Sequence, residues 1–318
     1  MMFSIVIPTF NRREIIHRAI DSALAQGADE LEVIVVDDGS VDGTIESLAK
    51  IYSDRPVRIL RNNRAKGPAG ARNTGMLAAR GELIGLLDSD DEFLPGHLAA
   101  AAGAFRTHPE LDVIFGRARY ERNGQPEDYM GPNFERKLAA APKLHSDDSL
   151  TIFGTEFFTH LLQYGCWFNL STVVLRPSAA RELMNEDLRV SEDYEFWVRL
   201  SRIHQFACLH APQIRYALHN DNLSFESAGS VPDHAPRLLR ALQVILAYPD
   251  LNAMQSRLIR KQMAEVLFDW AYRSSRRRQL LEAFRLHLAS LRHGRRRANL
   301  WAILKLPATP LLRKNCVP

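Results

Sequence analysis

The stretch LLDSDDEF places three aspartates, Asp88, Asp90 and Asp91, directly after an apolar run. A helix cap or a turn needs only one carboxylate, so three of them within four residues indicate a site that binds positive charge. Mg²⁺ and Mn²⁺ prefer carboxylate oxygens as ligands. The stretch therefore predicts a divalent-cation site. For Asp37 and Asp42, which occur in VVDDGSVDGT, a turn or a helix cap is an equally good interpretation.

A second acidic pair, Glu192 and Asp193, begins a stretch with helical spacing. A carboxylate held beside a hydroxyl group can take its proton during group transfer, so this pair could supply a general base. Two acidic residues after Ser191 are also typical of an ordinary helix start, because the helix macrodipole favours negative charge there. Trp197 lies one helical turn further along, where it could form a pocket wall or a core contact.

Small residues surround Arg72 in the stretch GPAGARNTG. Small side chains let the backbone come close to a ligand, and a guanidinium can pair with phosphate or stack on a base. The other interpretation is a glycine-rich turn followed by a helix with a surface arginine. The stretch has neither the Rossmann GxGxxG pattern nor the Walker Lys-Ser/Thr pattern, which disfavours dehydrogenases and P-loop enzymes.

The elements that must position these residues alternate along the first third of the chain. Near-continuous apolar runs predict strands at residues 3–8, 31–38, 57–62 and 82–88. Helical spacing between them predicts helices at residues 12–25, 42–51 and 69–79. Such alternation is typical of a parallel sheet with helices on both faces. Ligands bind beyond the carboxyl ends of the strands in such sheets, where the aspartates occur.

The rest of the chain is less regular up to about residue 228. Residues 111–122 predict two short strands with a bend at Gly116, and residues 171–175 predict another strand. Residues 123–150 are rich in Pro, Asp, Lys and Asn, which predicts a mobile loop. Residues 192–203 predict a helix, and from about Pro236 onward only helical periodicity remains.

Five motifs occur in the order expected for one known family: PTFNR, VVDDGSVDGT, GPAGARNTG, LLDSDDEF and SEDYEFW. On these motifs, residues 3–225 resemble the inverting family-2 glycosyltransferases of the GT-A fold. The resemblance implies an α/β structure for residues 1–228, with a GT-A Rossmann-like mixed sheet flanked by helices. Residues 229–318 would then be a basic, mainly helical extension. The implied reaction moves a sugar from a nucleotide-diphosphate-sugar to an acceptor hydroxyl with inversion.

The resemblance also assigns roles on the donor side. A diphosphate is a poor leaving group unless its charge is neutralised, and a divalent cation, Mn²⁺ or Mg²⁺, would do this. Asp90 is the implied direct ligand, with His219 as a further ligand of the metal or the diphosphate. Asp91 is either a ligand or a partner of one. The implied donor-side residues are Pro8, Thr9, Asn11, Asp38, Arg72, Asp88 and Ser89.

On the acceptor side, the resemblance makes Asp193 the base and places Glu192 and Trp197 near it. Phe168, Asn169, Ser171 and Thr172 lie where the acceptor side of this fold forms, although ordinary loop and strand residues explain them equally well. The arginine that the family carries near His219 is not at its usual place, and Arg215 is the available substitute.

Charge divides the chain. From Arg237 to the end there are 17 of the 41 Lys/Arg and 4 of the 37 Asp/Glu, a balance of +13, so the part before it has a balance of −9. Basic, leucine-rich helices are typical of contact with an anionic membrane surface or an anionic partner, or of a simple helical cover with solvated arginines. No basic motif interleaved with aromatic residues indicates nucleic acid.

The sequence also bears on location and partners. Three cysteines far apart in the sequence fit a reducing cytoplasm, and no run approaches the roughly 18 apolar residues of a membrane span. We therefore expect a cytoplasmic protein, at the inner face of a membrane if the basic helices bind lipid. The expected partners are a nucleotide-sugar and a glycan, lipid-linked or small-molecule acceptor. A nucleotidyltransferase and a catalytically silent nucleotide-sugar-binding module are the alternatives.

Overall fold

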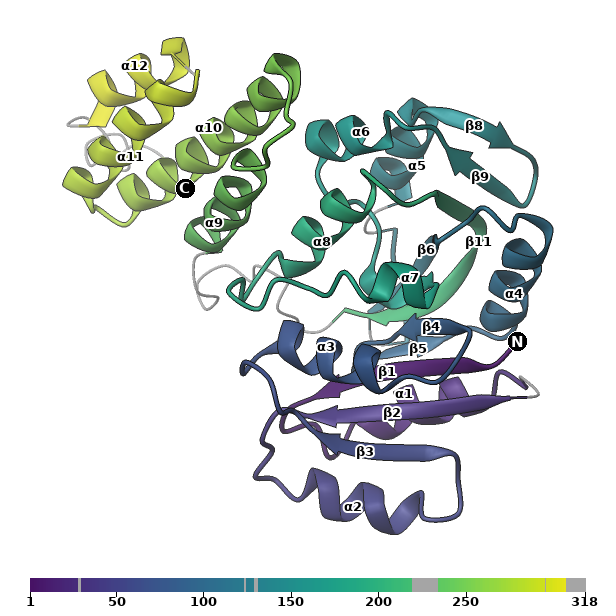
Figure 1. Cartoon of the computed structure of the whole chain (residues 1–318). Coiled ribbons are helices and arrows are strands. Elements are labelled where there is room, and N and C mark those ends of the chain that lie inside the picture. Colours follow the sequence, from purple (N-terminus) through teal and green to yellow (C-terminus); the bar gives the residue numbers. More distant parts are fainter. Residues whose placement is uncertain (28–29, 123, 129–130, 219–233, 295, 307–318) are drawn as a thin grey trace. The chain divides into compact units, whose positions relative to one another are not determined.

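The computed structural model describes residues 1–27, 30–122, 124–128, 131–218, 234–294 and 296–306. Its contacts divide the chain into two units, Met1–Val231 and Pro232–Pro318, which Figure 1 shows in sequence colours. The boundary predicted after residue 228 lies outside the described residues, as does His219.

One mixed sheet forms the centre of the first unit. Its strand order is β3-β2-β1-β4-β10-β6-β11-β9-β8, with β5 paired to β11 and β7 paired to β6. The strands are β1 (Phe3–Thr9), β2 (Leu31–Asp37), β3 (Val57–Arg61), β4 (Leu83–Leu86), β5 (Asp91–Phe93), β6 (Val113–Arg122), β7 (Gln125–Pro126), β8 (Lys143–Ser146), β9 (Leu150–Phe153), β10 (Val174–Leu175) and β11 (Phe206–Ala217). The first four are parallel to one another, whereas β10 is antiparallel to both β4 and β6.

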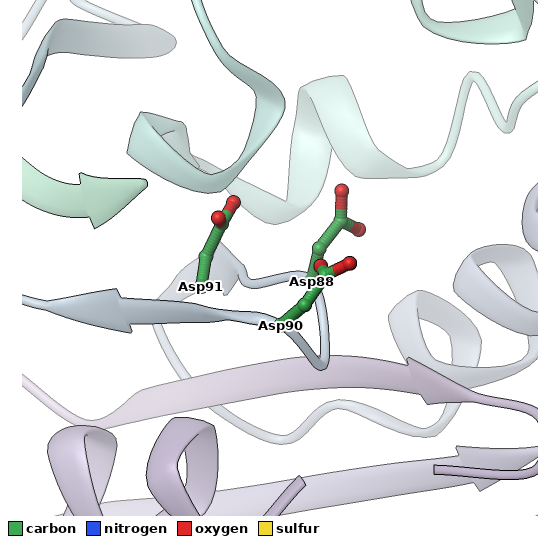
Figure 2. A group of neighbouring side chains, drawn as sticks. All are labelled: Asp88, Asp90 and Asp91. Carbon is green, nitrogen blue, oxygen red and sulfur yellow. The ribbon is translucent and has the colours of Figure 1, made fainter. Parts of the chain in front are cut away.

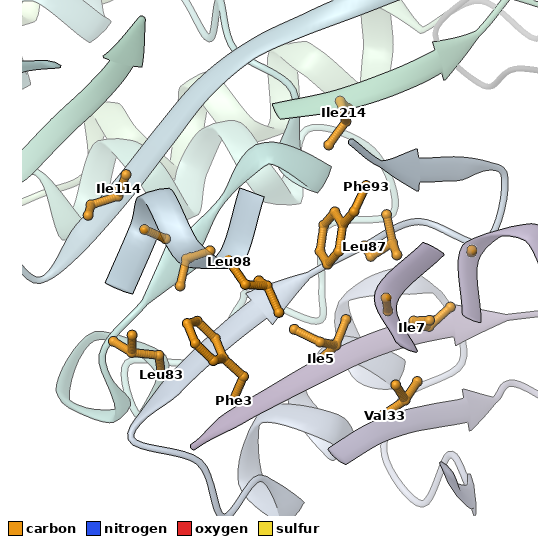
Figure 3. Close-up of a cluster of buried hydrophobic side chains, with 14 of the residues drawn as sticks. Phe3, Ile5, Ile7, Val33, Leu83, Leu87, Phe93, Leu98, Ile114 and Ile214 are labelled. Carbon is orange, nitrogen blue, oxygen red and sulfur yellow. The ribbon is translucent and has the colours of Figure 1, made fainter. Parts of the chain in front are cut away.

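The helices of this unit flank the mixed sheet (Figure 1). They are α1 (Ile16–Leu24), α2 (Thr44–Ile51), α3 (Pro68–Ala78), α4 (His97–Thr107), α5 (Gly131–Ala140), α6 (Phe157–Tyr164), α7 (Pro177–Ala180) and α8 (Glu192–Leu200). Alternate residues of a strand point to opposite faces. Ile5 and Ile7 accordingly join the core cluster that contains residues of α1 and α4 (Figure 3). Ile34 and Val36 pack on the other face with Ala71 of α3. The small residues of α3 let it lie directly on β1, since a Cβ at Gly75 would come within 2.3 Å of Val6.

The predicted bend at Gly116 is wrong, because β6 runs unbroken from Val113 to Arg122. Its glycine instead makes room for Gln213 of β11, whose Cγ would lie 2.3 Å from an added Cβ. The irregularity belongs to β11, whose register with β6 shifts between Leu209 and Ile214.

The mobile loop predicted over residues 123–150 is also wrong in the part that the structure describes. That part contains β7, α5 and β8. Two apolar side chains four residues apart, Phe134 and Leu138, are buried, and the Phe134 ring lies 5.0 Å from that of Trp167. Because the segment is otherwise polar, its sequence does not indicate this single buried stripe. The strand predicted over 171–175 is mostly wrong too, because a 3₁₀ turn at Leu170–Thr172 precedes the two-residue β10.

The second unit is helical, as predicted from residue 236 onward. Its helices are α9 (Ala235–Leu246), α10 (Ala253–Arg276), α11 (Leu280–His293) and α12 (Arg296–Lys305). Asn252 and Gln255 form a reciprocal capping box at the start of α10. Ser290 of α11 donates a hydrogen bond to the Ala264 carbonyl of α10, at 2.7 Å. Within the described residues, no helix has the length and apolar character needed to cross a membrane.

Candidate active site

The acidic loop, residues 87–91, runs from the end of β4 to the first residue of β5. Carboxylate oxygens of Asp88, Asp90 and Asp91 all lie within 4.8 Å of one another (Figure 2). The first two side chains are partly exposed, whereas Asp91 is only 2% exposed. Arg12 approaches Asp90 at 3.7 Å. The structure thus brings together the three aspartates whose spacing predicts a cation site.

Ser171 holds the shape of this loop. Its hydroxyl accepts a hydrogen bond from the backbone N–H of Asp88, at 3.0 Å, and donates one to Asp91 Oδ2, at 2.5 Å. The sequence offers no signal for this role, because Ser171 is 80 residues from Asp91 in the chain. The sequence allowed two equal interpretations of Ser171, an acceptor-side residue or an ordinary loop or strand residue. The structure shows a buried side chain that supports the acidic loop.

The aspartate group fits a hard cation. Burial raises the pKa of Asp91 well above its ordinary value, and the charges of Asp88 and Asp90 raise it further. Its buried Oδ1 has no hydrogen-bond partner within the described part of the chain. An oxygen in that position, beside two accessible carboxylates, matches the all-oxygen ligand sets of Mg²⁺ and Mn²⁺.

Arg72 joins the acidic loop to α8. Its guanidinium donates to Asp88 Oδ1 at 2.6 Å and to Glu192 Oε1 at 2.9 Å. Burial opposes its charge, but the two carboxylates outweigh this effect and raise the pKa of Arg72. The side chain is buried, so the alternative of a surface arginine is wrong. It has to be charged there, because only a cation compensates two carboxylates removed from water.

Glu192 and Trp197 are both buried, so the core contact is the interpretation of Trp197 that its burial supports. The Glu192 side chain is buried and pairs with Arg72. Trp197 is 0% exposed, and its ring lies 5.0 Å from Phe196 and 5.8 Å from Phe168. The helical spacing that puts Trp197 one turn from Asp193 also puts it on the face of α8 that packs into the core.

Asp193 stands in the first turn of α8 with a partly exposed side chain. Its Oδ1 accepts a hydrogen bond from the N–H of Tyr194, at 2.7 Å. Burial raises the pKa of Asp193, and the charge of Asp88 adds to this, although Tyr194 and Arg72 oppose it. A raised pKa makes the carboxylate a stronger proton acceptor, as a general base requires.

The loops after β1 and β2 are held together by the residues predicted to face a donor. Asn11, at a left-handed φ of 53°, donates its N–H to Ser40 Oγ at 2.8 Å, and its Oδ1 accepts from Val41 N at 2.9 Å. Thr9 ends β1, and its buried Oγ1 has no hydrogen-bond partner in the described residues. Pro8 lies within β1, paired with Val36.

Two neighbouring aspartates at the end of β2 accept hydrogen bonds from different parts of the site. Asp37 accepts hydrogen bonds from the N–H groups of Gly39 and Ser40, so it shapes the turn, one of the two interpretations of this residue. Asp38 accepts from Asn62 Nδ2 at 2.6 Å and from Gly67 N at 2.9 Å. Asp38 therefore connects the loop after β2 to the start of α3, the helix that contains Arg72.

Ser89 and Arg215, which the sequence also singled out, have different surroundings in the structure. Ser89 is buried in the acidic loop, between Asp88 and Asp90 in the sequence. Arg215 of β11 pairs with Glu92 at 3.0 Å and Glu121 at 3.3 Å, so its charge is compensated within the sheet. Sequence reasoning missed Arg12, although it belongs to the PTFNR motif, and Asn62, for which no local pattern exists.

Solved structures share this architecture. The S. aureus TarS structure in complex with UDP-GlcNAc aligns with a TM-score of 0.63 over 97% of this chain and 88% of that chain, at 18% sequence identity. The mannosyltransferase PcManGT from Pyrobaculum calidifontis, in complex with GDP-Man and Mn²⁺, aligns with a TM-score of 0.56 over 99% and 76%, at 15% identity. These likenesses establish the fold, which is the α/β GT-A class predicted from the motifs.

Sequence comparison then gives the family. Residues 4–160 match the profile of Glycosyl transferase family 2. The succinoglycan biosynthesis protein ExoO of Rhizobium meliloti (strain 1021) is 37% identical over 179 residues, which are 46% of this chain and 51% of ExoO. Residues 4–160 of the chain therefore belong to glycosyltransferase family 2. The chain spans about half the length of ExoO.

Proposed function

We propose that this chain transfers a sugar from a nucleotide-diphosphate-sugar to an acceptor hydroxyl, with inversion at the sugar carbon. One observation carries the proposal: Arg72 connects Asp88 of the cation-binding group to Glu192, the neighbour of Asp193. A site for a leaving diphosphate and a site for a proton acceptor are thereby held in one rigid unit. Family membership supports the same reaction.

Asp88 and Asp90, with Asp91 behind them, would hold the divalent cation, Mn²⁺ or Mg²⁺. When bound, the cation neutralises the diphosphate charge that develops as the sugar departs. Arg72 keeps Asp88 oriented, and Ser171 keeps the loop closed around it. The TarS and PcManGT structures contain UDP-GlcNAc and GDP-Man, which supports a nucleotide-sugar donor here.

The nucleoside end of the donor would meet the loops after β1 and β2. Thr9 and Asn11 on one loop and Asp38 on the other form this side, with Pro8 and Ser89 flanking them. Asp193 would take the proton from the acceptor hydroxyl as it attacks. One base acting in a single in-line displacement gives inversion.

A thermal-shift screen of UDP-, GDP-, dTDP- and CMP-sugars, each with and without Mn²⁺, tests the donor site. A ligand that binds only the folded protein stabilises it by about 2.7 kcal/mol at a hundredfold excess over its Kd. We expect one nucleotide to raise the Tm only with Mn²⁺, and Asp90→Ala to abolish this shift. A wild-type protein that responds to none of them contradicts the proposal and favours the nucleotidyltransferase alternative. Turnover with any acceptor then separates an enzyme from a silent module.

We also propose that the second unit contacts an anionic membrane surface, which would bring the enzyme to a lipid-linked acceptor at the inner face of the membrane. Large apolar side chains are exposed on two adjoining helices, and we call them the α11/α12 face: Leu281, Phe284, Leu288, Leu300, Trp301 and Leu304. Lys305 lies 5.8 Å from the Trp301 ring. Exposed Leu and Trp beside basic residues are typical of helices that lie in the membrane interface.

A further inference from the structure

Arg12 lies beside the acidic loop and brings a positive charge to it. Its guanidinium is 3.7 Å from Asp90 Oδ2, and the two side chains are 27% and 19% exposed. We propose that Arg12 is a counterion that a divalent cation displaces from Asp90, and that the released guanidinium then binds the diphosphate of the donor. The proposal rests on the transferase function proposed above, and it adds a link between the binding of the cation and the binding of the donor.

The backbone of Arg12 is fixed, so a change of partner involves only its side chain. Its N–H donates to Thr44 Oγ1 at 3.3 Å. Its carbonyl accepts from the N–H groups of Ile15 and Ile16, at 3.1 and 3.0 Å, just before α1. The side chain lines a cleft of about 620 Å³, which gives the guanidinium room to turn away from Asp90.

A divalent cation and the Arg12 guanidinium compete for the same carboxylate. Ion pairs between partly exposed side chains contribute little to stability, so the pair with Asp90 is easily broken. A cation held by Asp88 and Asp90 would lie close to the guanidinium, and the repulsion between their positive charges favours its departure. Arg72 differs because it is buried between Asp88 and Glu192. Arg12 is therefore the arginine of the site whose position responds to the cation.

The carboxylates around the cleft already have partners of their own. They are Glu92 with Arg215 at 3.0 Å and Arg18 at 4.0 Å, Glu121 with Arg119 at 2.9 Å and Arg215 at 3.3 Å, Asp42 with the N–H of Arg13 at 3.1 Å, and Glu14 with Arg13 at 4.0 Å. A diphosphate on the cation brings new negative charge to the same place. A guanidinium binds phosphate oxygens through paired, charge-assisted hydrogen bonds. The diphosphate is therefore the anion that replaces Asp90 as the partner of Arg12.

This exchange gives Arg12 opposite effects on two affinities. Arg12 weakens the binding of the free cation, because it has to leave Asp90 first. It strengthens the binding of the diphosphate, because it then contacts the phosphate oxygens. Each ligand thus raises the affinity of the site for the other, and Arg12 contributes to this coupling.

Calorimetric titration of the full chain tests the exchange with two kinds of probe, Mn²⁺ alone and then UDP, GDP or dTDP at saturating Mn²⁺. Arg12→Gln should bind Mn²⁺ alone at least about threefold more tightly than the wild type, because the competing charge is gone. The same variant should bind the nucleoside diphosphate that the wild type recognises at least about tenfold more weakly. Arg13→Gln removes a neighbouring arginine that is 54% exposed and pairs with Glu14, and it should bind both probes as the wild type does.

The outcomes separate this proposal from the proposed function. Equal or weaker Mn²⁺ binding by Arg12→Gln overturns the displacement, and unchanged diphosphate binding overturns the second step. Either result, on a wild type that binds both probes, contradicts the role of Arg12 and leaves the proposed function standing. A wild type that binds Mn²⁺ but none of the three diphosphates contradicts the donor site of the proposed function and, with it, the second step. Tighter Mn²⁺ binding by Arg12→Gln then still supports the displacement.

Discussion

Asp193 has one role in the proposed reaction, to take the acceptor proton. Removing a general base costs about 10²- to 10⁴-fold in rate, so Asp193→Asn should lower kcat by that range while the nucleotide-sugar thermal shift stays intact. Steady-state kinetics and the thermal shift on the same protein check both parts. Asp187→Asn, an exposed carboxylate in the turn before α8, is the matched control. A variant at Asp193 with near-normal kcat would remove it from the reaction.

Arg72 is a residue on which both halves of the site depend. Removing one partner of a buried ion pair costs about 3–5 kcal/mol, so Arg72→Met should lower the free energy of unfolding by that amount. Adding Glu192→Gln should recover part of the loss, because one uncompensated carboxylate is then gone. Urea denaturation measures both variants.

The control for Arg72 is Arg122→Met, which breaks the half-exposed pair with Glu127 and should cost no more than about 1 kcal/mol. If both arginine variants lose the same stability, the burial of Arg72 has no energetic consequence and the bridge between the two carboxylates is not a structural support.

Among the elements, α4 is joined to β11 by a buried histidine. His97 Nδ1 lies 2.7 Å from Gln213 Oε1, and burial lowers the pKa of His97 from 6.5 to about 4. Between these values the unfolded chain binds a proton that the folded chain does not, so stability is lost as the pH falls from 6.5 to about 4. The difference corresponds to about 3 kcal/mol in all.

His97→Gln removes the titrating group and keeps a donor for Gln213. Its stability should therefore fall less steeply between pH 6.5 and about 4 than that of the wild type, as measured by urea midpoints across the range. Parallel pH profiles for the two proteins would show that another group controls acid unfolding.

The strands and helices differ in how clearly the sequence predicts them. The strands β1, β2 and β4 could be predicted because both faces of each are buried and their apolar runs are nearly continuous. The polar residues that follow these strands could be placed at one edge of the sheet, because the carboxyl ends of parallel strands lie at the same edge. α5 could not be predicted, because only Phe134 and Leu138 mark its buried stripe. Arg72 and Glu192 lie 120 residues apart, so their bridge leaves no local pattern.

Across the whole molecule, the charge division separates an acidic first unit from a basic helical second unit. The site described above, with its cluster of carboxylates, lies in the acidic first unit. Exposed apolar side chains in a basic unit need a separate explanation, since large apolar patches mark interaction surfaces. The charge of +13 from Arg237 to the end favours an anionic surface as the partner.

Sedimentation with lipid vesicles tests this partner. The wild type should bind phosphatidylglycerol vesicles more strongly than phosphatidylcholine vesicles, and added salt should weaken the difference. Leu281→Glu with Trp301→Glu changes side chains that are 65% and 66% exposed and should weaken binding at least about tenfold. Met254→Glu changes an apolar side chain of α10 that is 56% exposed and lies outside the α11/α12 face, and it should bind as the wild type does. Equal binding to both lipids would contradict an anionic membrane partner. Self-association that the double variant abolishes would instead assign the face to a second copy of the chain.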